Sequence, residues 1–257
     1  MKRALLLTAV AMMTAVSAQA QELKTDDLGI FNHGSLSVGI GTTGITADLA
    51  LPITPYVSVR GGADICPFKY NTDLKVEYGN AVYQAILPDK IAVTGKLSMF
   101  TGHLLFDFFP LRQSSLRFTA GAYLGNSKVA EAYNTNEGAL IAGTIYNRGV
   151  PDRLKVGYSL GDYLLTPDEN GNIKGSVTVS KFRPYVGIGF GRPELTKRHI
   201  TCNFDLGVLF WGKPKVECQG QELTKEGLNG KNGGIVRRIS QMSVWPVLNF
   251  RLAVRLF

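Results

Sequence analysis

The side chains of this sequence that could carry chemistry are three histidines and a set of aspartates and arginines. His103 stands four residues before Asp107, so in an extended segment both side chains point to the same face. A histidine beside a carboxylate is a minimum requirement for acid–base catalysis. It is more often a hydrogen-bonded structural pair, and neither His33 nor His199 lies in a motif typical of a hydrolase. We therefore expect no catalysis.

The aspartates and arginines share one property, which is that each alternates with apolar neighbours. Buried charges are tolerated only when they are paired, so we predict an interior network of Arg–Asp ion pairs. In an open interior the same side chains would line an ion-selective channel. The candidates are Asp48, Arg60, Asp64, His103, Asp107, Arg117, Arg183, Asp205, Arg251 and Arg255.

The segments that carry these residues alternate between apolar and polar positions, as strands between two different media do. Arginines stand at mid-strand on the polar face, whereas a soluble β-sandwich would show short neutral residues there. Phe and Leu continue to the strand ends of the apolar face, as an aromatic girdle requires. The pattern predicts an all-β fold, an antiparallel transmembrane up-and-down β-barrel. The long segments are 56–66, 97–109, 116–126, 182–190, 200–211 and 248–256.

The connections set the strand count. Two shorter strands at 36–40 and 45–51 differ in parity, so 41–44 is either a turn or a bulge. Short and long connections alternate, which predicts about eight strands with both termini periplasmic. A hairpin at 164–179, centred on Asn170-Gly171, would extend the barrel above the membrane or raise the count to about ten to twelve. The short connections are 51–55, 110–115 and 191–198, and the long extracellular ones are about 67–95, 127–180 and 213–243.

The N-terminus predicts export. Lys2 and Arg3 precede an apolar run, and Ala18-Gln19-Ala20 has the small-x-small pattern of a signal-peptidase site. We expect residues 1–20 to be removed before Gln21, leaving 21–257 as one barrel domain. No second apolar run reaches the ~18–20 residues of a spanning helix.

Cysteine usage and acidic clusters predict neither a disulfide framework nor a metal site. The chain has three cysteines at irregular spacing, and no pair has the spacing of a metal motif. If one bridge forms, Cys66 with Cys218 is favoured, because both are expected on the extracellular side. We expect no cofactor and no metal.

In these motifs the chain resembles the small outer-membrane β-barrel families, the OmpA/OmpX/OmpW-like and opacity-protein group. It is most similar to uncharacterised Bacteroidetes members. The resemblance implies a Gram-negative outer membrane, with barrel-assembly machinery and periplasmic chaperones as partners during biogenesis. Phe257 resembles the assembly signal, although the apolar residues of the last strand are offset from it by one. The motifs are 38–44, 60–62, 106–110, 184–189 and the C-terminal strand.

These observations predict a monomeric barrel with a structural or surface-interaction role, in contact with outer-membrane lipid and lipopolysaccharide. The net charge of +8 is better explained by loops, lumen and anionic lipid headgroups than by nucleic acid. Lysines and arginines in 213–243, interleaved with glutamates, could bind polyanions. The alternative function is a small, porin-like diffusion channel for ions or small solutes.

Overall fold

The computed structural model describes most of the predicted barrel domain. The predicted signal peptide 1–20, the terminal Phe257 and His199 lie outside the described residues. The described residues are 29–75, 90–111, 114–151, 158–160, 163–192, 200–219, 221–222 and 241–256.

Eight antiparallel strands close into a ring, as the alternation predicted. Each strand of the ring pairs with the next ring strand along the chain, and β14 pairs with β1 to close the ring. The barrel prediction and its count of eight are confirmed. In ring order the strands are β1 (Ser35–Gly41), β2 (Gly44–Thr54), β3 (Val57–Lys75), β4 (Lys90–Phe108), β5 (Leu116–Gly125), β10 (Phe182–Phe190), β11 (Ile200–Phe210) and β14 (Val244–Arg255).

The parity switch at 41–44 is a hairpin turn and not a bulge. Gly41 pairs with Gly44 across the turn. Gly44 has a positive φ of 107°, and a Cβ there would lie 2.2 Å from the carbonyl oxygen of Ile65. The position therefore requires glycine, and the reversal of the chain explains why the apolar residues change parity.

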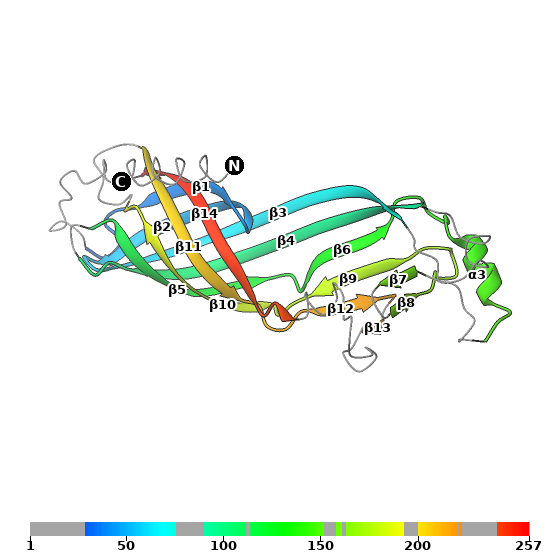
Figure 1. Cartoon of the computed structure of the whole chain (residues 1–257). Helices are drawn as coiled ribbons and strands as arrows, with labels where there is room; N and C mark the ends of the chain where they lie inside the picture. Colours follow the sequence, from blue (N-terminus) through cyan, green and yellow to red (C-terminus); the bar gives the residue numbers. More distant parts are fainter. Residues whose placement is uncertain are drawn as a thin grey trace, which may run out of the picture.

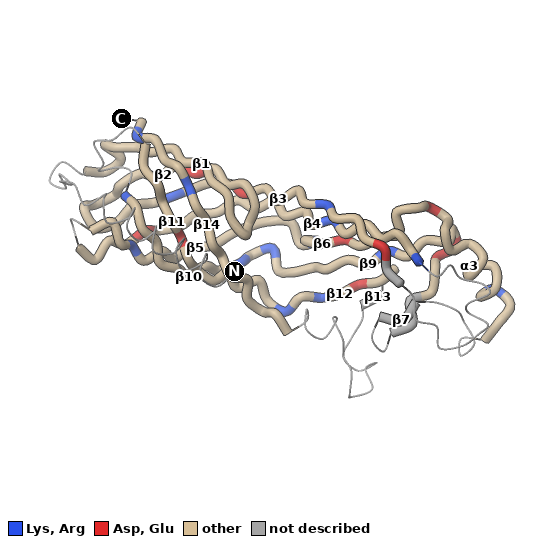
Figure 2. The backbone as a smooth tube through the Cα atoms, turned by 45° about the horizontal axis from the view of Figure 1, so that its top comes forward, with Lys and Arg blue, Asp and Glu red and all other residues tan. Residues whose placement is uncertain are grey.

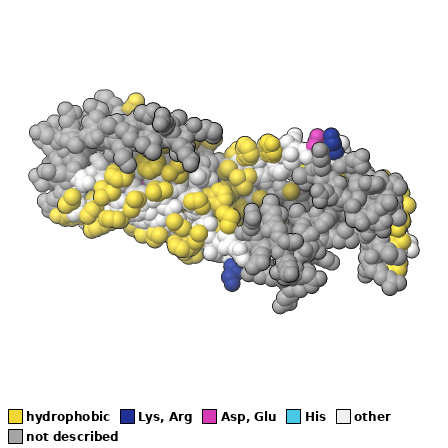
Figure 3. All heavy atoms as spheres, in the orientation of Figure 1, with side chains coloured by type: hydrophobic (Ala, Val, Ile, Leu, Met, Phe, Trp, Pro, Cys, Tyr) yellow, Lys and Arg dark blue, Asp and Glu magenta, His cyan; other side chains and the backbone are white. Residues whose placement is uncertain are grey.

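Apolar side chains gather on the outer surface of the ring (Figure 3). Polar and charged side chains are buried inside it. A water-soluble monomer rarely exposes so large an apolar surface, and a closed ring leaves no unpaired strand edge for lipid to solvate. This distribution is that of a barrel whose strands face lipid. The exposed side chains of the belt include Leu36, Val38, Ile40, Ile45, Leu49, Phe100, Leu104, Phe106, Phe118, Leu124, Val186, Leu206, Leu248, Phe250 and Leu252.

Two strands run far beyond the ring and carry an open sheet (Figure 1). Pairing of β3 with β2 ends at Ile65, yet β3 remains paired with β4 as far as Lys75 and Lys90. At ~3.3 Å per residue, this hairpin rises roughly 30 Å above the ring. Four further strands join it, in the order β6-β9-β12-β13 outward from β4. They are β6 (Lys128–Asn134), β9 (Lys174–Thr178), β12 (Lys215–Cys218) and the short β13 (Gln221–Glu222).

The segments expected as long loops thus contain regular structure, and this sheet is called the extension below. Besides these strands it carries α3 (Ile141–Asn147) and the small pair β7 (Tyr158–Leu160) and β8 (Tyr163–Leu165). The prediction of a hairpin at 164–179 is wrong in its pairing. A turn does form at Asp168, but β8 pairs with β7, and β9 pairs with β6 and β12. Local alternation could not show that each arm has a distant partner.

Apolar side chains fill the part of the lumen nearest the extension. One cluster contains Leu105, Tyr123, Tyr185, Leu209 and Val247. A second lies where the ring meets the extension and contains Met99, Val129, Val179 and Trp211, with Trp245 packed against it. No α-helix in the described ranges has the length and apolarity to cross a bilayer.

The cysteine pairing that we favoured is not formed. Cys66, Cys202 and Cys218 are all free thiols. Cys66 lies on β3 and Cys218 on β12, and β4, β6 and β9 lie between these strands in the sheet. Adjacent strands are ~4.8 Å apart, so the separation is far greater than a disulfide spans. Burial raises the pKa of the Cys218 thiol on β12, outside the ring.

Candidate functional site

A network of ion pairs, called the brace below, crosses the lumen. It joins Arg60, Arg117 and Arg251 to Asp48, Asp107 and Asp205. Arg60 on β3 reaches Asp205 on β11 at 3.4 Å and Asp107 on β4 at 3.2 Å. In ring order β3 and β11 are four places apart, so Arg60 and Asp205 join opposite walls of the barrel. Both side chains are at most 4 % exposed. This pair therefore occupies the barrel axis and links walls that share no backbone hydrogen bonds.

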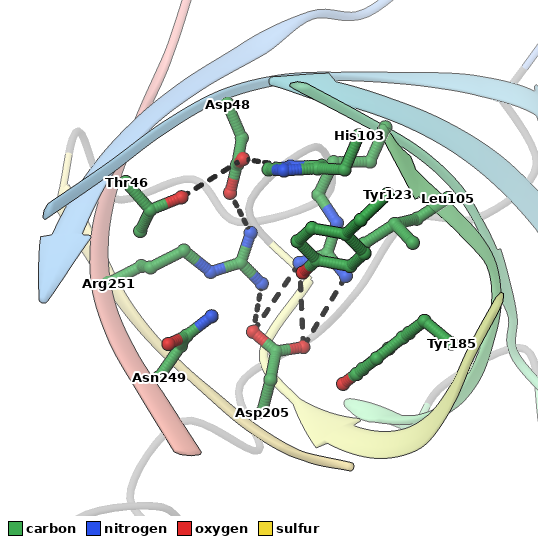
Figure 4. Close-up of a pocket in the computed structure, with 10 residues that line it drawn as sticks. Thr46, Asp48, His103, Leu105, Tyr123, Tyr185, Asp205, Asn249 and Arg251 are labelled. Atoms are coloured by element: carbon green, nitrogen blue, oxygen red, sulfur yellow. Dashed lines mark hydrogen bonds and ion pairs between the residues drawn. The ribbon is translucent and has the colours of Figure 1, made fainter. Parts of the chain in front are cut away.

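Asp205 is the hub of the brace. It also accepts a hydrogen bond from Nη2 of Arg117 at 2.6 Å. Arg251 joins Asp205 to Asp48, because the N–H groups of its Nη1 and Nη2 donate hydrogen bonds to Asp48 and Asp205, respectively (Figure 4). Removing one partner from such buried pairs leaves an unpaired charge, which costs far more than the pair contributes. The interacting strands are consequently held in one arrangement.

His103 lies between two carboxylates. Its Nε2 is 2.6 Å from Oδ1 of Asp48 on β2, and its Nδ1 is 2.9 Å from Oδ2 of Asp64 on β3. The imidazole packs on the ring of Tyr123, with centroids 4.7 Å apart. The pairing of His103 with Asp107 that we considered is not formed, because residues four apart on one strand are separated by roughly 13 Å. Asp107 instead bonds Arg60 and Thr119.

Two predicted arginines have other environments. Arg183 points inward and is fully buried, but it donates to the backbone carbonyl oxygens of Ser180 and Asn126 at 2.7 and 2.5 Å. It lies at the extension end of β10, away from the aspartates that pair with the other arginines. Arg255 has the inward parity of β14, yet as the last residue of the strand it is only half-buried.

Sequence reasoning missed the residues that complete the lumen. Arg192 closes the end with the short turns. Its guanidinium lies 4.0 Å from the centre of the Phe109 ring and donates to the carbonyl oxygen of Pro55. It sits in a predicted turn, and nothing in the sequence marks it. Tyr123 and Tyr185 pack edge to face at 5.5 Å; their inward parity was the available signal.

Hydroxyl groups satisfy the carboxylates that have fewer arginine partners. Asp64 accepts hydrogen bonds from Thr43 and Thr101 at 3.0 and 3.3 Å. Asp48 accepts bonds from Ser37 and Thr46. Together with the ion pairs, these hydrogen bonds tie the carboxylates of the lumen to several strands and restrict their movement.

Small cavities remain on either side of the brace. One lies between the brace and the cluster of Leu105, Tyr123 and Tyr185, and one lies toward the short turns; each has a volume of about 10 Å³, room for about one water molecule. Arg60 and Arg251 border both cavities and so separate them. Among the described residues, no group of histidine, cysteine and acidic side chains is placed to hold a metal ion.

A closed ring of eight antiparallel strands, an apolar outer belt and charges buried within the lumen define a transmembrane β-barrel of the outer-membrane type. Solved structures with similar folds include two from Acinetobacter baumannii, CarO (14% identity, TM-score 0.47, 86% of this chain and 96% of that one) and CarO2 (16%, 0.48, 88% and 99%). A major outer membrane protein from Thermus thermophilus is less similar (14%, 0.35, 87% and 98%). At these identities and scores none of them assigns a function to this chain. No family model matches the sequence, and no curated protein matches it.

Proposed function

We propose that this protein is a closed outer-membrane barrel with a structural or surface-interaction role, in which the extension is the part that contacts other molecules. The observation that carries the proposal is the brace from Arg60 to Asp205 across the lumen. An eight-stranded barrel is just wide enough for side chains to fill it. Here ion pairs fill one part of the lumen, and the apolar cluster that contains Tyr123 and Tyr185 fills another.

The extension supports the surface role because it presents two chemically different faces. One row of residues that pair from strand to strand across β3, β4, β6, β9 and β12 is charged or polar. The adjacent row points to the opposite face of the sheet and is apolar. Figure 2 shows charged residues along the extension as well as within the ring. The polar row is Lys69, Lys96, Glu131, Ser176 and Glu217, and the apolar row is Phe68, Leu97, Ala130, Val177 and Val216.

The proposal places the protein in the outer membrane of a Gram-negative cell, with the signal peptide cleaved before Gln21 and the extension outside. The short turns and both ends of the described barrel then face the periplasm, since Ser35 pairs with Arg255 at that end. Lipopolysaccharide is the expected neighbour of the outer half of the barrel. Lys213 and Lys215 are exposed at the start of the basic segment and would contact its phosphate groups.

The test is single-channel recording of the mature protein, refolded and inserted in planar bilayers at neutral pH. Heat-modifiable gel migration confirms that the barrel is folded before recording. We expect a silent barrel. Steady, reproducible conductance steps would contradict the filled lumen and support the second candidate, a diffusion channel lined by the same arginines and aspartates.

A further inference from the structure

One edge of the extension is open in the described part of the chain. β3 forms this edge (Figure 1). It pairs with β2 only as far as Ile65, and from there to Lys75 no described strand lies on that side of it. An open edge presents backbone N–H and C=O groups without sheet partners and is a template for another strand.

Hydrogen bonds on β4 show which residues of β3 face this edge. The carbonyl oxygen of Ala92 on β4 accepts a hydrogen bond from Thr135, beside β6, so Ala92 faces away from β3. Ala92 is the partner of Asp73 on β3. Two partners in an antiparallel ladder face either toward or away from each other, so the backbone groups of Asp73 face the open edge. Every second residue does the same, which adds Asn71 and Lys69.

The side chains along this edge differ between the two faces of the extension. Lys69, Asn71 and Asp73 are exposed on the outer face. Tyr70 has the parity of Arg60 and so lies on the face that continues the lumen wall, where its side chain is 62 % exposed. A strand that pairs with this edge therefore meets alternating charge on one face and an aromatic ring on the other.

Residues 69–73 form their own antiparallel complement. They read Lys-Tyr-Asn-Thr-Asp, so a second copy aligned with Asn71 opposite Asn71 places Lys69 opposite Asp73 on both sides of the centre. Tyr70 then lies opposite Thr72, an aromatic and β-branched pair of the kind that stabilises sheets. In this register the residues that face the open edge meet each other, so each of their three pairs exchanges two backbone hydrogen bonds.

The second copy also offsets an unfavourable contact within each chain. Lys69 on β3 and Lys96 on β4 are partners, and like charges directly opposite each other destabilise a sheet. In the same row Glu131 bonds Lys128 at 3.2 Å, and within the described ranges no carboxylate bonds Lys69 or Lys96. Asp73 of the second copy would place a carboxylate on the free side of Lys69.

We propose that residues 69–73 of β3 pair antiparallel with the same residues of a second copy, so that two extensions form one continuous sheet. The proposal rests on the surface role proposed above and names a second copy of this chain as the partner. The barrel expected as a monomer then forms a two-fold symmetric pair, in which both copies use the same surface.

The direction of pairing decides where the two barrels lie. Two barrels inserted in the same direction in one membrane present parallel β3 edges. The two-fold axis through Asn71 instead points the barrels in opposite directions. Their rings then end roughly 40 Å apart along the strands, at ~3.3 Å per residue, and the two extensions lie side by side between them. The pair therefore joins two opposing membranes.

Tethering between vesicles tests the pairing. Mature wild type is reconstituted into phosphatidylcholine vesicles that carry a donor dye and into others that carry an acceptor dye, and energy transfer between the two populations is measured. Vesicles without protein give the background. We expect the wild type to raise the transfer several-fold. Lys69→Asp alone and Asp73→Lys alone should return it to the background, because each places like charges opposite each other. Vesicles of one single variant should tether those of the other, since opposite charges then meet at both positions.

The double variant Lys69→Asp/Asp73→Lys has the net charge of the wild type and isolates the register. It should tether itself, because both ion pairs form again with the charges exchanged. It should not tether the wild type, because lysine then meets lysine and aspartate meets aspartate. Lys128→Glu/Glu131→Lys is the matched control, since it exchanges an ion pair away from the edge, and it should tether both itself and the wild type. Lys69 and Asp73 are exposed on the extension, so the ring should fold in each variant, which heat-modifiable gel migration verifies.

The outcomes separate the two proposals. Background transfer with the wild type would overturn the self-pairing, while a silent barrel in planar bilayers would leave the closed lumen and a different surface partner standing. Tethering of the wild type by the double variant would also overturn the self-pairing, because the register would then have no effect. Conductance steps from a protein that keeps the whole tethering pattern would support the self-pairing and overturn the closed lumen alone.

Discussion

Asp205 accepts hydrogen bonds from Arg60, Arg117 and Arg251, which reach it from three different strands. Each of these guanidiniums is almost wholly buried. Asparagine is nearly isosteric with aspartate but carries no charge, so Asp205→Asn would leave the arginines with a positive excess in the lumen. Breaking a buried ion pair in this way costs about 3–5 kcal/mol.

We therefore expect Asp205→Asn to lower the free energy of unfolding by about 3–5 kcal/mol. Urea titration of the barrel in lipid vesicles measures it, with the fluorescence of Trp211 and Trp245 as the signal, since these rings pack together at the mouth of the lumen. Asp73→Asn is the matched control because Asp73 is exposed on the extension, and it should change stability by less than about 0.5 kcal/mol. Equal effects of the two changes would show that the hub is not what holds the barrel.

At the scale of a strand, neighbouring glycines on β3 have opposite surroundings because side chains alternate between the lumen and the lipid. A Cβ on Gly62 would lie 2.2 Å from Oδ1 of Asp48 and 2.8 Å from Nε2 of His103. A Cβ on Gly61 would have no neighbour closer than 3.9 Å. Gly62 thus makes room for the ion pair between His103 and Asp48, whereas Gly61 faces outward.

Gly62→Ala should destabilise the barrel by about 1–3 kcal/mol, the usual cost of overpacking an interior. Gly61→Ala, one residue away, should change stability by less than about 0.5 kcal/mol. Thermal unfolding followed by heat-modifiable gel migration compares the two. The parity argument fails if Gly61→Ala proves the more damaging substitution.

At the scale of the whole molecule, exposure to solvent in an isolated chain does not distinguish a lipid-facing side chain from a water-facing one. Phe250 on β14 is 44 % exposed, and Phe68 on β3 is 59 % exposed. Phe250 is flanked in the ring by Ile40 and Phe204. Phe68 lies beyond the last pair between β2 and β3, and so above the expected membrane.

Phe250→Arg should cost about 2–4 kcal/mol, because a charge placed near the bilayer midplane must be solvated by lipid. Phe68→Arg on the extension should cost less than about 0.5 kcal/mol. The same urea titration in vesicles measures both. If the two substitutions cost the same, the ring does not span the bilayer at the level we assign.

Much of the barrel could be predicted from local pattern. Alternation has a period of two, so any strand with lipid on one face and packed side chains on the other shows its orientation in its own sequence. This is why the strand count and the inward position of Arg60, Asp107 and Asp205 were predicted. The extension was not, because loops and short strands that pair with distant segments have no comparable periodicity.

The sequence by itself determined that this chain forms a membrane-spanning β-barrel with charges inside and apolar residues outside, since both follow from residue type and parity. Only the tertiary structure decided which charges meet. Closure of the ring and its register bring His103 between Asp48 and Asp64, and carry Arg183 to backbone carbonyl oxygens instead of a carboxylate. These partners come from strands far apart in sequence, and their distances depend on the stagger of neighbouring strands, which no single strand encodes.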